Sequence, residues 1–179
     1  IIANKDSEYK RLGGIISDAR LAGMIDWEAI VDRTRVSRKN QHWQSPGEIL
    51  GAAASSYMLD SREGQEYYIE VWVEKDALIG VVEQACEGVD VPCLSTRGYA
   101  SQTALWEAAQ RMIAASDNGK NSIIFHLGDH DPSGIDMTRD IQDRINLLTP
   151  GLPVEVKRIA LNMDQVEEHR PPPNPAKVT

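Results

Sequence analysis

The 179-residue sequence lacks the features that mark membrane and secreted proteins. No apolar run approaches the roughly eighteen residues that a membrane-spanning helix needs, and the first residues lack the basic flank and long apolar stretch of a signal peptide. We therefore expect a cytoplasmic protein without a membrane partner. Cysteine is also scarce: Cys86 and Cys93 have neither zinc-ligand spacing nor a disulfide framework, so we expect two reduced, mostly buried thiols.

Basic residues are fewer than acidic ones, which bears on binding to nucleic acids. The chain has 19 Lys and Arg against 27 Asp and Glu, a net charge of −8 that argues against a non-specific nucleic-acid binder. The deficit is uneven, since residues 1–44 hold 8 basic and 6 acidic residues whereas residues 45–179 hold 11 and 21. The first region contains a run of bases that could face phosphates in DNA, although such a run is more commonly a solvated patch. The bases of this run are Arg33, Arg35, Arg38 and Lys39.

A regular alternation of strand and helix patterns begins at Tyr67. Runs rich in β-branched and aromatic residues predict four strands, and apolar residues at helical spacing between them predict three helices. This alternation predicts the α/β class, with a parallel β-sheet and helices on both faces. The expected organisation is a small helical segment over residues 1–44, a connector over 45–66, the sheet domain over 67–162, and a Pro-rich tail or linker over 163–179.

Three acidic residues follow strands of this predicted sheet. Glu74 ends the first strand, and Asp129 and Asp131 follow the third, with a glycine on either side of the acidic loop. Carboxyl ends of parallel strands meet at one edge of a sheet, and aspartates two apart in an extended chain project to the same side. Three gathered carboxylates are costly unless a divalent cation or a proton compensates them. Mg²⁺, which prefers oxygen ligands, is the expected cofactor, and Mn²⁺ could replace it.

Structural roles for the same residues stay open. Asp131 before Pro132 is typical of a helix N-cap, and a single glutamate at a strand end is commonly solvated. His130 should point away from the two aspartates along an extended chain, and we expect it to be a surface histidine. Arg97, on the loop after the second strand, is a further candidate for contact with nucleic-acid phosphate, although a loop arginine is often merely exposed.

The joint pattern resembles a known family. Glu74 after the first strand, the Asp129-x-Asp131 pair after the third, and the order of strands and helices are similar to the Toprim domain, the Mg²⁺-binding module of topoisomerases, primases and several nucleases. The segment Gly128-Asp-His-Asp-Pro-Ser-Gly134 resembles the version in the topoisomerase VI A subunit and the meiotic double-strand-break transesterase. The resemblance covers roughly residues 67–162 and implies a Rossmann-like fold.

The resemblance also implies roles for these residues. Asp129 and Asp131 would hold Mg²⁺, and Glu74 would be a metal ligand or a general acid or base in the phosphodiester step. DNA is the implied partner, together with a second copy of the chain or a partner subunit.

The sequence shows no match to the nucleophile of this family. In the topoisomerase VI-like group a tyrosine on an N-terminal winged-helix domain attacks DNA. Residues 1–44 resemble the tail end of such a domain, with a helix over 8–23 and a short strand or wing after it. The tyrosine motif, an arginine shortly before a Tyr-Tyr pair in a helix, has no match there, and Tyr68 belongs to a core strand. We therefore expect a Mg²⁺-dependent, topoisomerase-like DNA-cleaving module whose nucleophilic tyrosine lies upstream or is absent.

Other functions stay open at this point. Without a tyrosine, the module could act as a hydrolytic nuclease through metal-activated water. Asp129 could instead be the nucleophile of a phosphatase, with Asp131 as its general acid, although the Pro-Ser-Gly turn that follows weakens that interpretation. A non-catalytic DNA-binding or scaffolding subunit is the third alternative. Dinucleotide binding is disfavoured because no Gly-x-Gly-x-x-Gly follows the first strand.

Overall fold

The computed structural model describes residues 5–30, 40 and 42–171. It divides the chain into two compact units, Ile1–Ser55 and Ser56–Thr179, which we describe separately. The helical elements among the described residues of the first part of the chain are α1 (Asp6–Leu21), the 3-10 turn η1 (Trp27–Ala29) and α2 (Pro46–Ser56).

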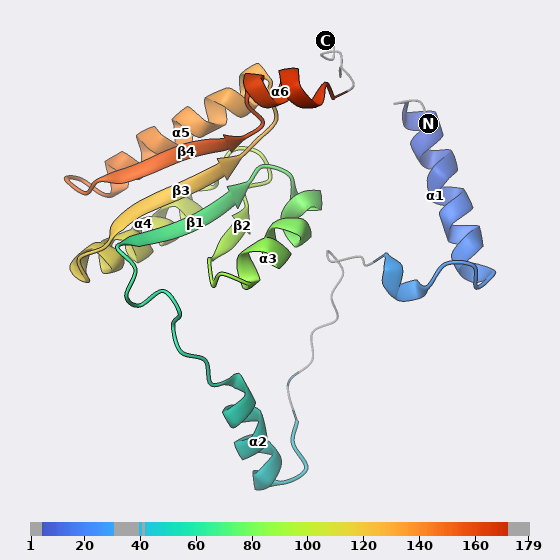
Figure 1. The fold of residues 1–179 in the computed structure, drawn as a ribbon, viewed down its shortest axis with the longest axis horizontal. Helices are drawn as coiled ribbons and strands as arrows, with labels where there is room; N and C mark the ends of the chain where they lie inside the picture. Colours follow the sequence, from blue (N-terminus) through green and yellow to red (C-terminus); the bar gives the residue numbers. More distant parts are fainter. Residues whose placement is uncertain (1–4, 31–39, 41, 172–179) are drawn as a thin grey trace. The chain divides into compact units, whose positions relative to one another are not determined.

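The second unit is built on a four-stranded sheet in which every neighbouring pair of strands is parallel (Figure 1). The strands lie in the order β2-β1-β3-β4 and are β1 (Tyr67–Val73), β2 (Cys93–Ser95), β3 (Asn121–Leu127) and β4 (Val154–Ala160). The helical elements between and after them are η2 (Asp76–Leu78), α3 (Ile79–Glu87), α4 (Gln102–Asp117), α5 (Pro132–Leu148) and α6 (Met163–His169). The predicted α/β class with an all-parallel sheet is confirmed.

Helices cover both faces of the sheet, as predicted. Because side chains alternate along a strand, Trp72 of β1 faces one side and Val73 the other. On the first side, Trp72 packs in a buried cluster with Leu105 of α4 and Ile141 of α5. On the second side, Val73 packs with residues of α3, among them Cys86. Strand direction and helix placement together bring the strand-end loops to one edge of the sheet.

Both cysteines are free thiols, as expected. Cys86 is buried in α3 and Cys93 is half-buried in β2. Burial raises the pKa of Cys93 to about 11, so this thiol stays protonated at neutral pH. Across the described residues, the structure contains no helix with the length and apolar character that a bilayer crossing demands.

The described part of the expected wing after α1 is helical. Residues 27–29 form the turn η1 instead of a strand. Arg20 explains this local shape, because its guanidinium donates to the carbonyl oxygens of Trp27, at 2.7 Å, and Ile30, at 3.1 Å. The same group lies 4.5 Å from the centre of the Trp27 ring, a cation–π contact. The rest of that expected wing lies outside the described residues.

One other expectation needs correction, at the segment after β4. The tail expected over 163–179 begins with helix α6, which a capping box starts: the Asn162 and Gln165 side chains each bond the backbone of the other residue. The sequence carries this pattern, Asn-x-x-Gln, but the proline-rich stretch that follows obscured it. The connector expected over 45–66, where the sequence allows a helix over 47–59 between turn formers, contains helix α2, which begins at Pro46 and ends at Ser56.

Candidate functional site

Glu74 and Asp129 come together at the carboxyl edge of the sheet. The ladder between β1 and β3 continues one residue past β1, because the backbone N–H of Glu74 donates to the carbonyl oxygen of Leu127 at 2.9 Å. The buried Glu74 side chain then accepts a hydrogen bond from the backbone N–H of Asp129 through Oε2, at 3.0 Å. Parallel pairing of two strands thus places the first acidic residue directly beside the second.

Lys75 supplies the positive charge that these carboxylates share. Its Nζ lies 2.9 Å from Glu74 Oε1 and 3.1 Å from Asp129 Oδ2. The hydrogen bond to Glu74, followed by the one to Asp129, raises the pKa of Lys75 well above its usual value, so the amine is a cation at neutral pH. No sequence pattern singles out this residue, although it stands next to Glu74 in the chain.

Asp131 serves a different purpose from Asp129. Its Oδ1 accepts a hydrogen bond of 2.7 Å from the backbone N–H of Gly134, which makes Asp131 the N-cap of α5, and Pro132 takes the first helical position. The capping role that the sequence left open is therefore the observed one. Among the described residues no three His, Cys, Asp or Glu side chains are grouped so as to hold a metal ion. The expected trio accordingly forms a pair, Glu74 and Asp129, with Asp131 directed to the helix.

Arg158 of β4 holds the acidic loop in shape. Its guanidinium donates to the backbone carbonyls of Gly128 and Asp129 on one side of the loop. It also donates to the carbonyl of Gly134, at 2.7 Å, at the start of α5. Two further acceptors of this guanidinium are Thr138 Oγ1 and the carbonyl oxygen of Leu161. One side chain thus ties β3, the acidic loop, α5 and the segment after β4 together.

The two glycines beside the acidic loop are sterically required there. A Cβ atom at Gly134 would overlap the carbonyl oxygen of Asp129. A Cβ atom at Gly128 would lie 3.2 Å from Glu74 Oε2 and from the Arg158 guanidinium, closer than most such contacts. The glycines therefore permit the close approach of backbone and charged groups on which the loop depends.

Two histidines lie near this edge and differ in burial. His126 of β3 is fully buried, and its Nδ1 lies 2.8 Å from Thr138 Oγ1. Burial, followed by the positive charge of Arg158, lowers the pKa of His126 to about 4, so the ring is neutral at pH 7. His130 is exposed, as expected, and its Nδ1 lies 3.0 Å from the carbonyl oxygen of Leu161.

Arg97 lies on a loop that is bonded directly to the end of β1. The backbone N–H of Gly98 donates to the carbonyl oxygen of Glu74, which fixes the loop beside the acidic pair. The Arg97 side chain is 75% exposed and pairs with Asp76 at 3.0 Å, a surface contact that a phosphate group could replace. The other predicted nucleic-acid contacts lie outside the described residues: Arg33, Arg35, Arg38 and Lys39.

A tyrosine that sequence analysis passed over stands on the same loop. The Tyr99 hydroxyl donates to Asp136 Oδ2 of α5 at 2.7 Å. This hydrogen bond raises the pKa of Tyr99 above its usual value, which disfavours the phenolate. Arg139 in turn pairs with the other oxygen of Asp136, so the tyrosine is part of a surface network.

The middle of β1 holds a second buried acid, Glu70, which no sequence pattern singles out. Its carboxylate accepts from the Tyr68 hydroxyl and from Trp72 Nε1, each at 2.8 Å. It also forms a two-point ion pair with Arg111 of α4, at 2.8 and 2.9 Å. Four donors therefore satisfy this carboxylate completely.

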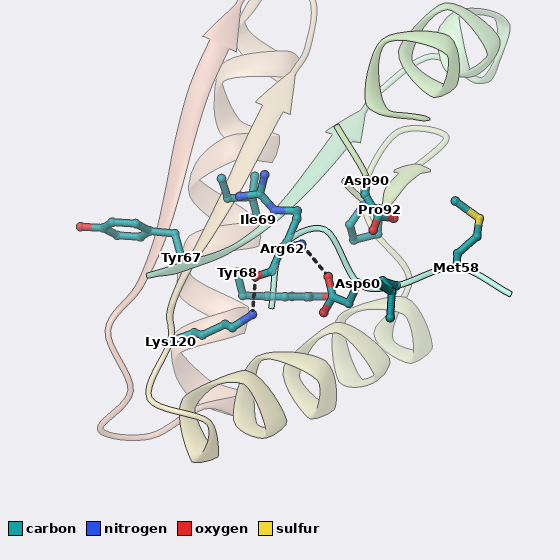
Figure 2. Close-up of a pocket in the computed structure, with 10 residues that line it drawn as sticks. Met58, Asp60, Arg62, Tyr67, Tyr68, Ile69, Asp90, Pro92 and Lys120 are labelled. Carbon is teal, nitrogen blue, oxygen red and sulfur yellow. Dashed lines mark hydrogen bonds between the residues drawn. The ribbon is translucent and has the colours of Figure 1, made fainter. Parts of the chain in front are cut away.

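A pocket of about 400 Å³ opens beside the amino end of β1 (Figure 2). Its polar groups are used within the protein: Lys120 Nζ donates to the carbonyl oxygen of Arg62, and the Arg62 backbone N–H donates to Asp60. Tyr67 and Tyr68, at the start of β1, line the same pocket. The pocket thus lies between residues 58–62 and the start of β1, at the end of the strand opposite Glu74. Neither Glu74 nor Asp129 lines it.

The fold and this edge define an α/β protein with an all-parallel sheet and a charged cluster where strands β1 and β3 end. No family model matches the sequence, and no curated protein matches it. A de novo designed Rossmann fold protein is similar in structure, with a TM-score of 0.32 and 13% sequence identity, over 57% of this chain and 92% of that one. No function follows from that likeness.

Proposed function

We propose that this chain is a Mg²⁺-dependent module for phosphodiester cleavage in DNA, of the transesterification type that the Toprim resemblance implies. The observation that carries the proposal is the meeting of Glu74 and Asp129 around one cation at the carboxyl ends of neighbouring parallel strands. Ligands of open α/β sheets bind at such an edge. A pair of carboxylates already arranged around a positive charge suits a divalent cation in the place of that charge.

The donor set fits Mg²⁺. This ion is commonly held by one or two carboxylates, with waters and substrate phosphate completing its coordination. Glu74 and Asp129 would provide those carboxylates, and Asp131, whose Oδ1 caps α5, stands two residues further on. When bound there, the ion offsets the charge that develops on a scissile phosphate.

The remaining residues of the edge position the substrate. Arg158 and Gly134 fix the backbone of the acidic loop, so that Asp129 is held against Glu74 before any ligand arrives. Arg97 offers an exposed guanidinium on the neighbouring loop, a group suited to a phosphate of the DNA backbone. Together these residues would orient a phosphodiester beside the metal.

Hydrolysis by metal-activated water is the second candidate, and the tyrosines favour it. Tyr68 lies at the far end of β1 with its hydroxyl bonded to Glu70. Tyr99 lies on the loop beside Glu74, but its hydroxyl donates to Asp136 and its pKa is raised. Neither is an activated nucleophile, so transesterification would need one of the other three tyrosines of the chain, Tyr9, Tyr57 or Tyr67, or a tyrosine from a partner.

The test uses the full chain and two measurements. We expect Mg²⁺ or Mn²⁺ to raise the melting temperature by mass action, and the double variant Asp129→Ala, Asp131→Ala to abolish that rise. Asp143→Asn, at an exposed carboxylate of α5 that pairs with Arg139, is the matched control and should leave it intact. Nicking of supercoiled plasmid is then measured with the same proteins.

The outcomes separate the candidates. A DNA–protein adduct that survives detergent indicates transesterification, whereas free nicked ends indicate hydrolysis. Absence of both the metal-dependent rise and the nicking would leave only a non-catalytic DNA-binding subunit. Nicking that persists in the double variant would show that the chemistry lies elsewhere in the chain.

A further inference from the structure

Lys75 occupies the point that a metal ion would need. Its single nitrogen lies within hydrogen-bond distance of both Glu74 Oε1 and Asp129 Oδ2. A Mg²⁺ ion coordinated by these two oxygens would sit about 2.1 Å from each, inside the space that the ammonium group fills. Two positive charges cannot share that space, so binding of the ion and binding of the ammonium exclude each other.

The ammonium group is also free to leave. The Lys75 side chain is 51% exposed, and it lies on a flexible four-carbon stem. Of its three donors, two are used by Glu74 and Asp129. By contrast Arg158, the other cation beside this loop, is held by several carbonyl acceptors and has no comparable freedom.

We infer that Lys75 is an exchangeable counter-ion, which a divalent cation displaces from between Glu74 and Asp129 and which then donates to a non-bridging oxygen of the substrate phosphodiester. The inference rests on the proposed function and adds to it a residue that both sets the metal affinity and contacts the substrate. Without metal, Lys75 keeps the acidic pair together; with metal, the same charge sits within one side-chain length of the phosphate. Occupation of the site by metal therefore makes a phosphate-binding group available.

The variant Lys75→Met tests both halves, because it keeps the length of the side chain and removes the charge. With no competing ammonium, we expect Mg²⁺ to bind about three- to tenfold more tightly, the range that loss of a partly exposed ion pair allows. Mg²⁺ affinity is measured by calorimetric titration of the full chain. In saturating Mg²⁺, anisotropy of a short labelled DNA duplex should show several-fold weaker binding by the variant.

Two lysine variants serve as controls. Lys157→Met removes the same charge from an exposed position in the middle of β4, and it should leave the Mg²⁺ affinity unchanged. Lys75→Arg retains a cation beside the acidic pair and should bind Mg²⁺ no more tightly than the natural protein. Lys75→Gln repeats the charge removal in case Lys75→Met folds poorly, as judged by its melting curve.

Each result decides one point. Equal Mg²⁺ affinity in Lys75→Met and the natural protein would overturn the displacement, and unchanged DNA binding in Mg²⁺ would overturn the phosphate contact. Both failures leave the metal site itself standing. If neither the natural protein nor Lys75→Met binds Mg²⁺, the proposed function fails and the inference falls with it. Binding of Mg²⁺ by Lys75→Met but not by the natural protein would support the displacement, with Lys75 excluding the ion completely.

Discussion

Strand β1 and the residue after it carry two buried glutamates whose surroundings differ. Glu70, with 1% of its surface exposed, accepts from two buried or half-buried side chains of its own strand and from Nε and Nη2 of Arg111. Glu74, with 6% exposed, accepts from one backbone N–H and from a lysine that it shares with Asp129. Burial alone therefore does not separate a structural acid from a candidate functional one.

The hydrogen-bond donors around the two glutamates distinguish the structural acid from the candidate functional one. Every acceptor position of Glu70 faces a donor that is fixed by packing or by two-point geometry, so no ligand can enter without breaking the cluster. Glu74 faces one rigid donor and one that can exchange with solvent. A carboxylate that stays buried while its cation is replaceable is suited to binding, and this contrast can be tested by mutation.

The largest effect is expected at Glu70. Glu70→Ala leaves Arg111 without its partner and the Trp72 and Tyr68 donors unsatisfied, which we expect to cost about 3–5 kcal/mol of unfolding free energy. Glu74→Ala should cost under about 2 kcal/mol, because it leaves one backbone N–H unpaired and relieves the crowding of carboxylates. Urea unfolding measures both, with the exposed Glu107→Ala of α4 as control. Equal losses at the two glutamates would break the comparison.

Next in size is a pH effect from His126, which lies on the Glu74 side of the sheet. Its pKa of about 4 in the fold is below that of an unfolded histidine, so the unfolded chain binds more protons as the pH falls. The contribution to stability is full above about pH 6.5 and is lost as the pH falls toward 4, on the order of 3 kcal/mol.

Melting curves between pH 7.5 and pH 4 of the natural protein and of His126→Gln measure that contribution. The variant should lose less stability over this window than the natural protein does. An equal loss of stability in the two proteins between pH 7.5 and pH 4 would contradict the neutral, buried state of His126.

A smaller loss of stability is expected at the acidic loop itself. Gly134→Ala forces a Cβ atom onto the carbonyl oxygen of Asp129, and we expect a cost of about 2 kcal/mol with a weaker response of the melting temperature to Mg²⁺. Gly88→Ala, at a position with ordinary φ and open space around it, is the control and should be nearly neutral. A Gly134→Ala protein with unchanged stability and Mg²⁺ response would mean that the loop need not be rigid.

The smallest effect is expected at Tyr99. Tyr99→Phe removes one exposed hydrogen bond to Asp136 and should change the melting temperature by less than about 2 °C. Plasmid nicking should also be unchanged, because the hydroxyl is not activated. Loss of nicking in Tyr99→Phe, with its fold intact, would instead make Tyr99 the nucleophile and shift the functional edge toward β2.

The sequence was sufficient for the sheet and for part of the site. Strand and helix periodicity from Tyr67 onward predicted the parallel architecture, and the position of Glu74 and Asp129 at strand ends predicted their meeting. Contacts that depend on side-chain direction between distant elements were missed, since Glu70 and Arg111 are separated by 41 positions and Arg158 and Asp129 by 29. Local sequence patterns do not encode which turn of a helix packs against which face of a strand. The sequence is compatible with two roles for Asp131, a metal ligand and a helix N-cap, and the structure shows the N-cap.

The residues of the acidic edge are synthesised at different times, because they lie far apart in the sequence. Glu74 and Lys75 are synthesised first and Asp129 follows, but the arginine that holds the acidic loop belongs to β4, the last strand of the sheet. A nascent chain that has not yet added β4 can pair β1 with β3 and bring the acids together, yet its loop has no clamp. Completion of the final strand is therefore the step at which the acidic loop gains its clamp, and a truncation before residue 158 would leave the loop without it.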